Sequence, residues 1–135
     1  EAQVVRHLEI ASKIRAGHGE DFPIMIVGDF NDNLLGHAEA GMILSRGYVD
    51  SVLALLENAS LEDTTTFTYM NGRVVQHQKM DGILMPASQI HRIKYSKVMT
   101  YLDETQWPIG LPRTFGQKAQ MPSDHNSVSA IIDIH

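Results

Sequence analysis

The sequence predicts an α/β (α+β) fold with one mixed, mainly antiparallel sheet that carries helices on one face. Three observations predict it. A helical pattern at the N-terminal end leads directly into the apolar run Ile24–Val27, as in proteins that layer helices on a sheet. The second half is rich in β-branched and aromatic residues and contains Asn71-Gly72, the strongest short signal for a β-hairpin. The chain closes on the alternating apolar segment 127–134, which is typical of a half-buried strand.

The elements of the first half follow from spacing and from turn residues. Apolar residues recur every three or four positions over residues 1–16, and a pair of glycines ends the expected helix. Residues 24–27 are a short apolar run between turn residues, so we expect a strand buried on both faces. Residues 37–46 form a second expected helix, ended by Gly47, and the segment 48–56 is compatible with either helix or strand.

The second half reads mainly as strands. We expect them at residues 64–70, 73–78, 82–85, 90–101 and 127–134. In the last of these, Val128, Ala130, Ile132 and Ile134 alternate and are expected to face inward. Residues 102–123 form a long irregular stretch with three prolines, and a loop of that length in a compact domain is usually functional.

Composition limits the class of protein. The 135 residues suit one domain, and we place no boundary within residues 1–135. No apolar run approaches the roughly 20 residues needed to cross a membrane, so we expect no membrane partner. The absence of cysteine excludes disulfides and cysteine zinc sites, and we expect an intracellular protein, cytoplasmic or nuclear. A formal net charge of −5 argues against a basic nucleic-acid-coating domain.

Asp29 and Asn31 follow the first apolar strand in the stretch GDFN. Ligands gather at the carboxyl ends of strands in α/β sheets, and residues two apart on an extended chain point the same way. A carboxylate can deprotonate water while a neutral amide donates to phosphate oxygens. The alternative is a turn in which Asp29 caps and Asn31 is left-handed. An EF-hand is rejected, because Leu34 and Ala40 occupy its glycine and glutamate positions.

Two further motifs carry ionisable side chains. Asp81 stands just before the apolar segment GILM, and a buried carboxylate there needs a partner such as histidine. Asp124 and His125 stand just before the last strand, in the stretch PSDHNS. An Asp–His pair fixes the imidazole's tautomer and orientation. We therefore expect Asp81 and His125 to be hydrogen-bonded, the alternative being two ordinary surface turns.

In their order and kind, these three motifs resemble the endonuclease/exonuclease/phosphatase superfamily, the deoxyribonuclease-I-like fold. The resemblance implies a divalent-metal-dependent phosphoester hydrolase in which water attacks phosphorus. It implies catalytic roles for Asp29, Asn31, Asp81 and His125, and a Mg²⁺ or Mn²⁺ ion near Asp29 and Asp124. Gly82 departs from the family pattern, which often has tyrosine there.

The resemblance covers only the C-terminal half of such a domain, which is a four-layer α/β/β/α sandwich. Motifs of the N-terminal half, including the principal metal-binding glutamate, are absent from residues 1–135. We therefore expect a piece of a longer protein, inactive alone, whose open sheet is covered by the missing half or by a second copy. Two alternatives remain open: a non-catalytic binding module that keeps the fold, and an unrelated α/β interaction domain.

A narrower resemblance concerns the substrate. The Thr-rich segment 64–66 and the later LP and PSDH stretches are similar to the branch that holds deadenylases, nocturnin and 2′-phosphodiesterases. The branch holds several kinds of phosphoester hydrolase, so it narrows the substrate only slightly. The acidic composition and Trp107, a candidate for stacking on a base, favour a single-stranded RNA 3′ end or a nucleotide over duplex DNA. Arg92, Lys94 and Lys97 form either a small basic stripe or a solvated strand face.

Overall fold

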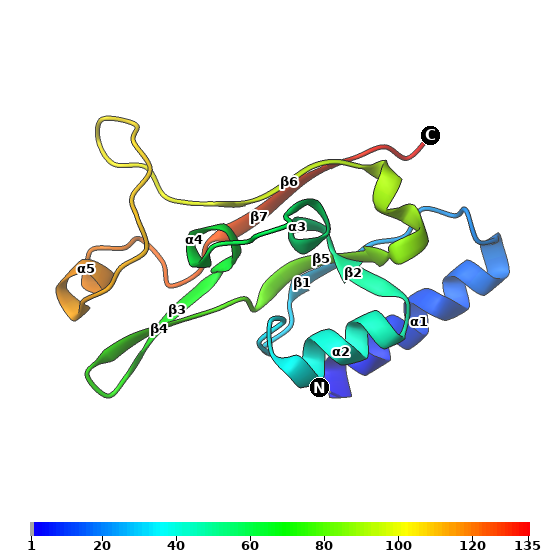
Figure 1. Cartoon of the computed structure of the whole chain (residues 1–135), viewed down its shortest axis with the longest axis horizontal. Coiled ribbons are helices and arrows are strands. Elements are labelled where there is room, and N and C mark those ends of the chain that lie inside the picture. Colours follow the sequence, from blue (N-terminus) through cyan, green and yellow to red (C-terminus); the bar gives the residue numbers. More distant parts are fainter. Residues whose placement is uncertain (1) are drawn as a thin grey trace.

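The computed structural model describes residues 2–135 and combines helices with small antiparallel sheets (Figure 1). The helices are α1 (Ala2–His18), α2 (His37–Ser45), α3 (Ser51–Leu55), α4 (Leu61–Thr64), the 3-10 helix η1 (Ala87–Arg92) and α5 (Phe115–Ala119). The strands are β1 (Ile26–Asp29), β2 (Tyr48–Asp50), β3 (Phe67–Asn71), β4 (Val74–Gln78), β5 (Asp81–Pro86), β6 (Ile93–Met99) and β7 (Ser127–Ile132). Within the described residues, no helix combines the length and the apolar character needed to cross a bilayer.

The strands form three sheets, so the expectation of one mixed sheet is wrong. The sheets have the orders β1-β5-β2, β3-β4 and β6-β7, and every ladder is antiparallel. The division between β4 and β5 has a clear cause. The carbonyls of Lys79 and Met80 accept from the amides of Leu34 and Phe30, at 2.7 and 2.9 Å, so the backbone there pairs with the loop after β1. The β3–β4 ladder therefore ends before β5 begins.

Strand β5 is the strand buried on both faces. Leu84 packs with Val4 and Leu8 of α1 in one core cluster, whereas Ile83 and Met85 belong to a second cluster. In Figure 1 the sheet that contains β5 lies between α1 and α2 on one side and β6–β7 on the other. Strand β5 therefore contributes side chains to both core clusters. The candidate site lies at its first residue, Asp81.

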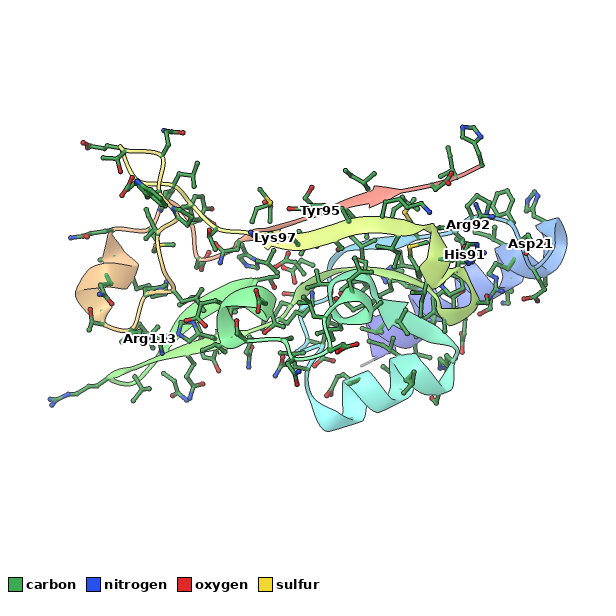
Figure 2. The ribbon with its side chains drawn as sticks, turned by 45° about the horizontal axis from the view of Figure 1, so that its top comes forward. Asp21, His91, Arg92, Tyr95, Lys97 and Arg113 are labelled. Atoms are coloured by element: carbon green, nitrogen blue, oxygen red, sulfur yellow. The ribbon has the colours of Figure 1, made fainter. Side chains whose placement is uncertain are left out.

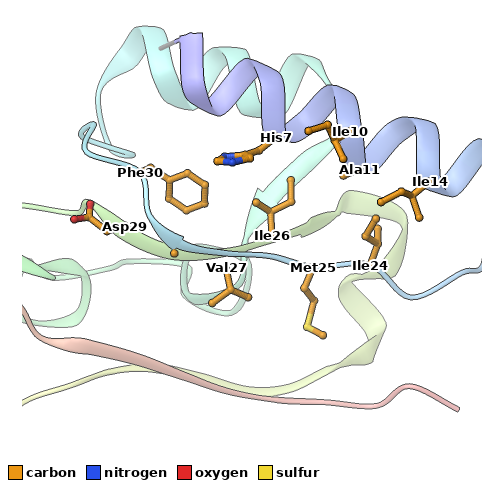
Figure 3. A pocket seen from close by; sticks show the side chains of 11 residues that line it. His7, Ile10, Ala11, Ile14, Ile24, Met25, Ile26, Val27, Asp29 and Phe30 are labelled. Atoms are coloured by element: carbon orange, nitrogen blue, oxygen red, sulfur yellow. The ribbon is translucent and has the colours of Figure 1, made fainter.

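Strand β1, in contrast, is an edge strand, and its expected burial on both faces is wrong. Ile26 and Phe30 point toward α1, while Val27 points away from it (Figure 3). The side chain of Val27 is 67% exposed. Among the described residues β1 pairs only with β5, and of its residues only Ile26 is partly buried.

The helices of the first half agree with the expectations. Helix α1 extends to His18 and is followed by Gly19 in a left-handed conformation, with φ of +100°. Helix α2 ends at Ser45, and Gly47 at φ of +75° turns the chain into β2. The ambiguous segment 48–56 divides at Asp50, whose carboxylate caps α3.

The elements of the second half differ in detail from the expectations. The β3–β4 hairpin forms, with Asn71 paired to Val74, so its two-residue turn is Gly72-Arg73. The segment 90–101 begins as the 3-10 helix η1, and the irregular stretch 102–123 contains α5. At the C-terminal end, Val128, Ala130 and Ile132 pack against the core, whereas Ile134 is 56% exposed because β7 ends at Ile132.

Candidate active site

The site is built around a short connector, residues 79–81, which links β4 to β5. Buried side chains hold its backbone from two sides. The hydroxyl of Thr66 accepts hydrogen bonds from the amides of Met80 and Asp81, both at 2.9 Å. The Nζ of Lys79 donates to the carbonyl of Asp81 at 2.9 Å. Because Thr66 and Lys79 are both fully buried, this arrangement fixes the point where Asp81 enters the sheet.

Asp29 is placed beside Asp81 by the β1–β5 ladder, in which the two residues are direct partners. Its Oδ1 accepts from the amide of Asn31 at 2.8 Å, and Asn31 is left-handed with φ of +50°. The alternative arrangement, a turn in which Asp29 caps and Asn31 is left-handed, therefore forms. It is compatible with a site, because Asp29 is exposed and its second oxygen makes no hydrogen bond with the described residues.

His125 reaches Asp81 from the other end of the chain. Its Nδ1 lies 2.8 Å from Oδ2 of Asp81, which confirms the predicted pairing across 44 residues. The ring also packs against Phe67, with centroids 4.7 Å apart. The hydroxyl of Tyr101 donates to the carbonyl of His125 at 2.9 Å. Because Nδ1 is paired with Asp81, Nε2 is the ring nitrogen that can contact a ligand or transfer a proton.

Three of the predicted site residues thus come together. Ligand atoms of Asp29, Asp81 and His125 all lie within 4.8 Å of one another. The hollow beside Asp81 and His125 has a volume of about 420 Å³ and is bounded by Tyr101. Two carboxylates and an imidazole at this separation can hold a divalent cation, or divide acid and base roles around one ligand.

Asp124 and Asn31 are not members of that three-residue cluster. Asp124 is exposed, and its carbonyl accepts from the amide of Thr68 at 2.8 Å. The metal-binding role of Asp124 and the phosphate-binding role of Asn31 stay predictions.

The sequence analysis did not predict a buried ion pair that lies next to the backbone of Asp81. The Nζ of Lys79 lies 3.0 Å from Oδ2 of Asp50, and both side chains are almost completely buried. The pair also limits the space at Gly82. A Cβ at Gly82 would meet Oδ2 of Asp50 at 2.7 Å and Leu34 at 2.8 Å. No sequence signal pointed to the pair, because Lys79 lies between the expected strands 73–78 and 82–85, where a charged side chain is ordinarily exposed.

Comparison with protein-family models, with curated proteins and with solved structures gave no match to this chain.

Proposed function

We propose that the intact protein is a divalent-metal-dependent phosphoester hydrolase and that this chain is the C-terminal half of an endonuclease/exonuclease/phosphatase domain. The observation that carries the proposal is the convergence of Asp29, Asp81 and His125, which come from three separate segments. Helices on one side of β5 and a second sheet on the other agree with part of a four-layer α/β/β/α sandwich.

The residues fit a Mg²⁺ or Mn²⁺ ion. Both ions favour carboxylate oxygens and commonly use only one or two protein carboxylates. Asp29 has a carboxylate oxygen without a hydrogen bond among the described residues, and by the resemblance Asp29 and Asp124 would hold the ion. When bound, the ion neutralises phosphate charge and stabilises the leaving oxygen.

The chain's own residues supply the rest of the mechanism. Asp29 orients a water molecule and takes its proton as the water attacks phosphorus. Asn31 donates from its amide to the phosphoryl oxygens. Asp81 holds His125 through Nδ1, so Nε2 stabilises the developing negative charge or transfers a proton. Such catalysis rests on positioning, which the paired β1–β5 register and the buried connector favour.

A single-stranded RNA end or a nucleotide is the proposed substrate class. Trp107 is 72% exposed on a loop held by Asp103, whose Oδ1 accepts from Trp107 and from both donors of Thr105. These bonds, the Thr105 hydroxyl first, hold the pKa of Asp103 below its ordinary value. A pre-ordered, exposed indole is suited to stacking on an unpaired base.

The charges argue against duplex binding. Arg92 lies beside His91 and Asp21 at one end of the molecule, while Arg113 lies at the other (Figure 2). The guanidinium of Arg92 donates to three backbone carbonyls, of Asp21, Asp133 and His135. Arg92 therefore stabilises the fold, which argues against a basic stripe formed with Lys94 and Lys97 on β6. Duplex affinity grows with the number of phosphates neutralised, and these side chains are too dispersed for that.

The test uses two variants with matched controls in the intact protein. We expect Asp29→Asn and His125→Ala each to lower kcat for metal-stimulated phosphodiester hydrolysis by at least about 10²-fold, the scale of positioned acid–base groups. Asp21→Asn and His91→Ala, at exposed positions away from the site, should leave kcat unchanged. Full activity in either site variant would overturn the proposal.

Two other outcomes are informative. Absence of metal-stimulated hydrolysis by the parent protein, together with retained nucleotide binding, would favour the non-catalytic binding module. A panel in which abasic duplex DNA is by far the best substrate would overturn the proposed substrate class.

A further inference from the structure

Lys79 is a fully buried lysine, which is rare because moving an ammonium group out of water is unfavourable unless it is paired. Its Nζ has two partners, the carboxylate of Asp50 at 3.0 Å and the carbonyl of Asp81 at 2.9 Å. The first partner neutralises the charge. The second lies in the backbone of a residue whose side chain holds His125.

The connector links this lysine to both carboxylates of the site. The carbonyl of Asp81 is held by Lys79 and its amide by Thr66, so rotation of the backbone at Asp81 is restrained at both ends. Asp29 is the ladder partner of Asp81, so its backbone is paired with the restrained backbone of Asp81. A displacement of Asp81 would loosen its 2.8 Å contact with Nδ1 of His125.

We propose that Lys79, paired with Asp50, is a positioning residue that acts through the backbone of Asp81 to hold His125 in one tautomer, with the proton on Nδ1. Because Asp50 neutralises Lys79, the effect is geometric. The inference deepens the proposed function and rests on it only for its effect on turnover; the effect on the tautomer is independent of any catalytic activity.

The space at Gly82 agrees with this assignment. A Cβ there would meet Oδ2 of Asp50 at 2.7 Å and would come within 3.7 Å of Nζ of Lys79. The strand that presents Asp81 thus leaves room for the ion pair directly beside it. A pair that served only to satisfy two charges would not need to lie against the first residues of the strand that forms the site.

The test removes the pair without leaving an unpaired charge. The double variant Lys79→Met/Asp50→Asn is neutral, and the Asn side-chain oxygen still caps α3. A destabilised control is Gln89→Leu, which removes the two partly buried hydrogen bonds that the Gln89 amide donates to the carbonyls of Glu20 and Phe22. Folding of each variant is checked by circular dichroism. If this double variant does not fold, Lys79→Gln/Asp50→Asn replaces it, since the shorter glutamine side chain keeps donors but withdraws from Asp81 and the pair stays neutral.

The first readout is the nitrogen spectrum of the His125 ring in the ¹⁵N-histidine-labelled intact protein, assigned with His125→Ala. The parent and Gln89→Leu should show one tautomer, protonated at Nδ1. The double variant should show averaging of both tautomers. An unchanged single-tautomer signal in a folded variant would overturn the inference, whether or not the protein hydrolyses phosphoesters.

The second readout is turnover. We expect the double variant to lower kcat about 10- to 100-fold, as for other residues that orient a site through a neighbour, with KM changed less than about twofold. In the His125→Ala background the same change should lower kcat no further than about twofold, because the positioned group is gone. Equal losses in both backgrounds would show a general structural role and would overturn the positioning role.

Discussion

Partial burial of one side chain, His77 on β4, makes the stability of the protein depend on pH. Its Nδ1 lies 3.2 Å from the hydroxyl of Thr68 across the β3–β4 ladder. Burial lowers the pKa of His77 below its ordinary value of 6.5, the charge of Arg113 lowers it further, and Glu62 opposes them. The folded state therefore favours the neutral ring more strongly than the unfolded state does.

This difference predicts a pH dependence of stability. Because the folded-state pKa of His77 is lowered, the unfolded chain binds the proton first as pH falls below 6.5. The free energy of unfolding should therefore be greatest above that pH and decrease as pH falls from there toward the folded-state pKa. His77→Gln should flatten this part of the curve in urea titrations from pH 8 to 5.5. An unchanged slope in His77→Gln would contradict the assignment.

Tight packing on both faces of strand β5 restricts the residues that its positions can hold. Its residues alternate between two cores, and its second residue, Gly82, lies against the Lys79–Asp50 pair. The side chains on either side of this strand are already in close contact. Even a single added methyl group there requires neighbouring atoms to move.

Two glycine substitutions test this packing. Gly82→Ala would place a Cβ 2.7 Å from Oδ2 of Asp50 and 2.8 Å from Leu34, so we expect a loss of about 1–3 kcal/mol in the free energy of unfolding. Gly41→Ala, within α2 and with no atom within 4 Å of its new Cβ, should instead add about 0.5–1 kcal/mol. Denaturant unfolding measures both, and equal effects would show that the space at Gly82 is not limiting.

At the scale of the whole molecule, the two faces of the β1 strand differ. Helix α1 covers Ile26 and Phe30, and the groove between α1 and β1 has a volume of about 340 Å³ (Figure 3). The opposite face presents Met25 and Val27, which are 41% and 67% exposed. Exposed apolar side chains on an edge strand favour association.

Residues 1–135 alone are therefore expected to self-associate and to show no phosphodiesterase activity at any Mg²⁺ or Mn²⁺ concentration. Val27→Lys should shift the chain toward monomer in sedimentation velocity. The matched control Leu44→Lys, at a 64% exposed position on α2, should not. Under the proposed function, activity should appear only when a separate segment that supplies the principal metal ligand is added. Robust turnover by a monomeric chain would mean that all catalytic ligands lie within these residues.

The sequence alone determined the helices of the first half and the β-hairpin, and it supplied the candidate site residues. Apolar spacing and glycine stops located α1 and α2, and Asn71-Gly72 located the hairpin, because these signals act within a few residues. The pairing of Asp81 with His125 was also predictable, since a carboxylate at a strand end needs a partner and the chain offers a histidine before another strand.

The tertiary structure alone decided which surfaces are covered and what supports the site. Ile24–Val27 and the GILM segment look alike as apolar runs, yet β5 is buried on both faces and β1 on one, because burial depends on which elements pack over each strand. Lys79 carries no signal in the sequence for burial. Its role depends on Asp50, distant in the chain, and such a contact exists only once the fold brings the two charges together.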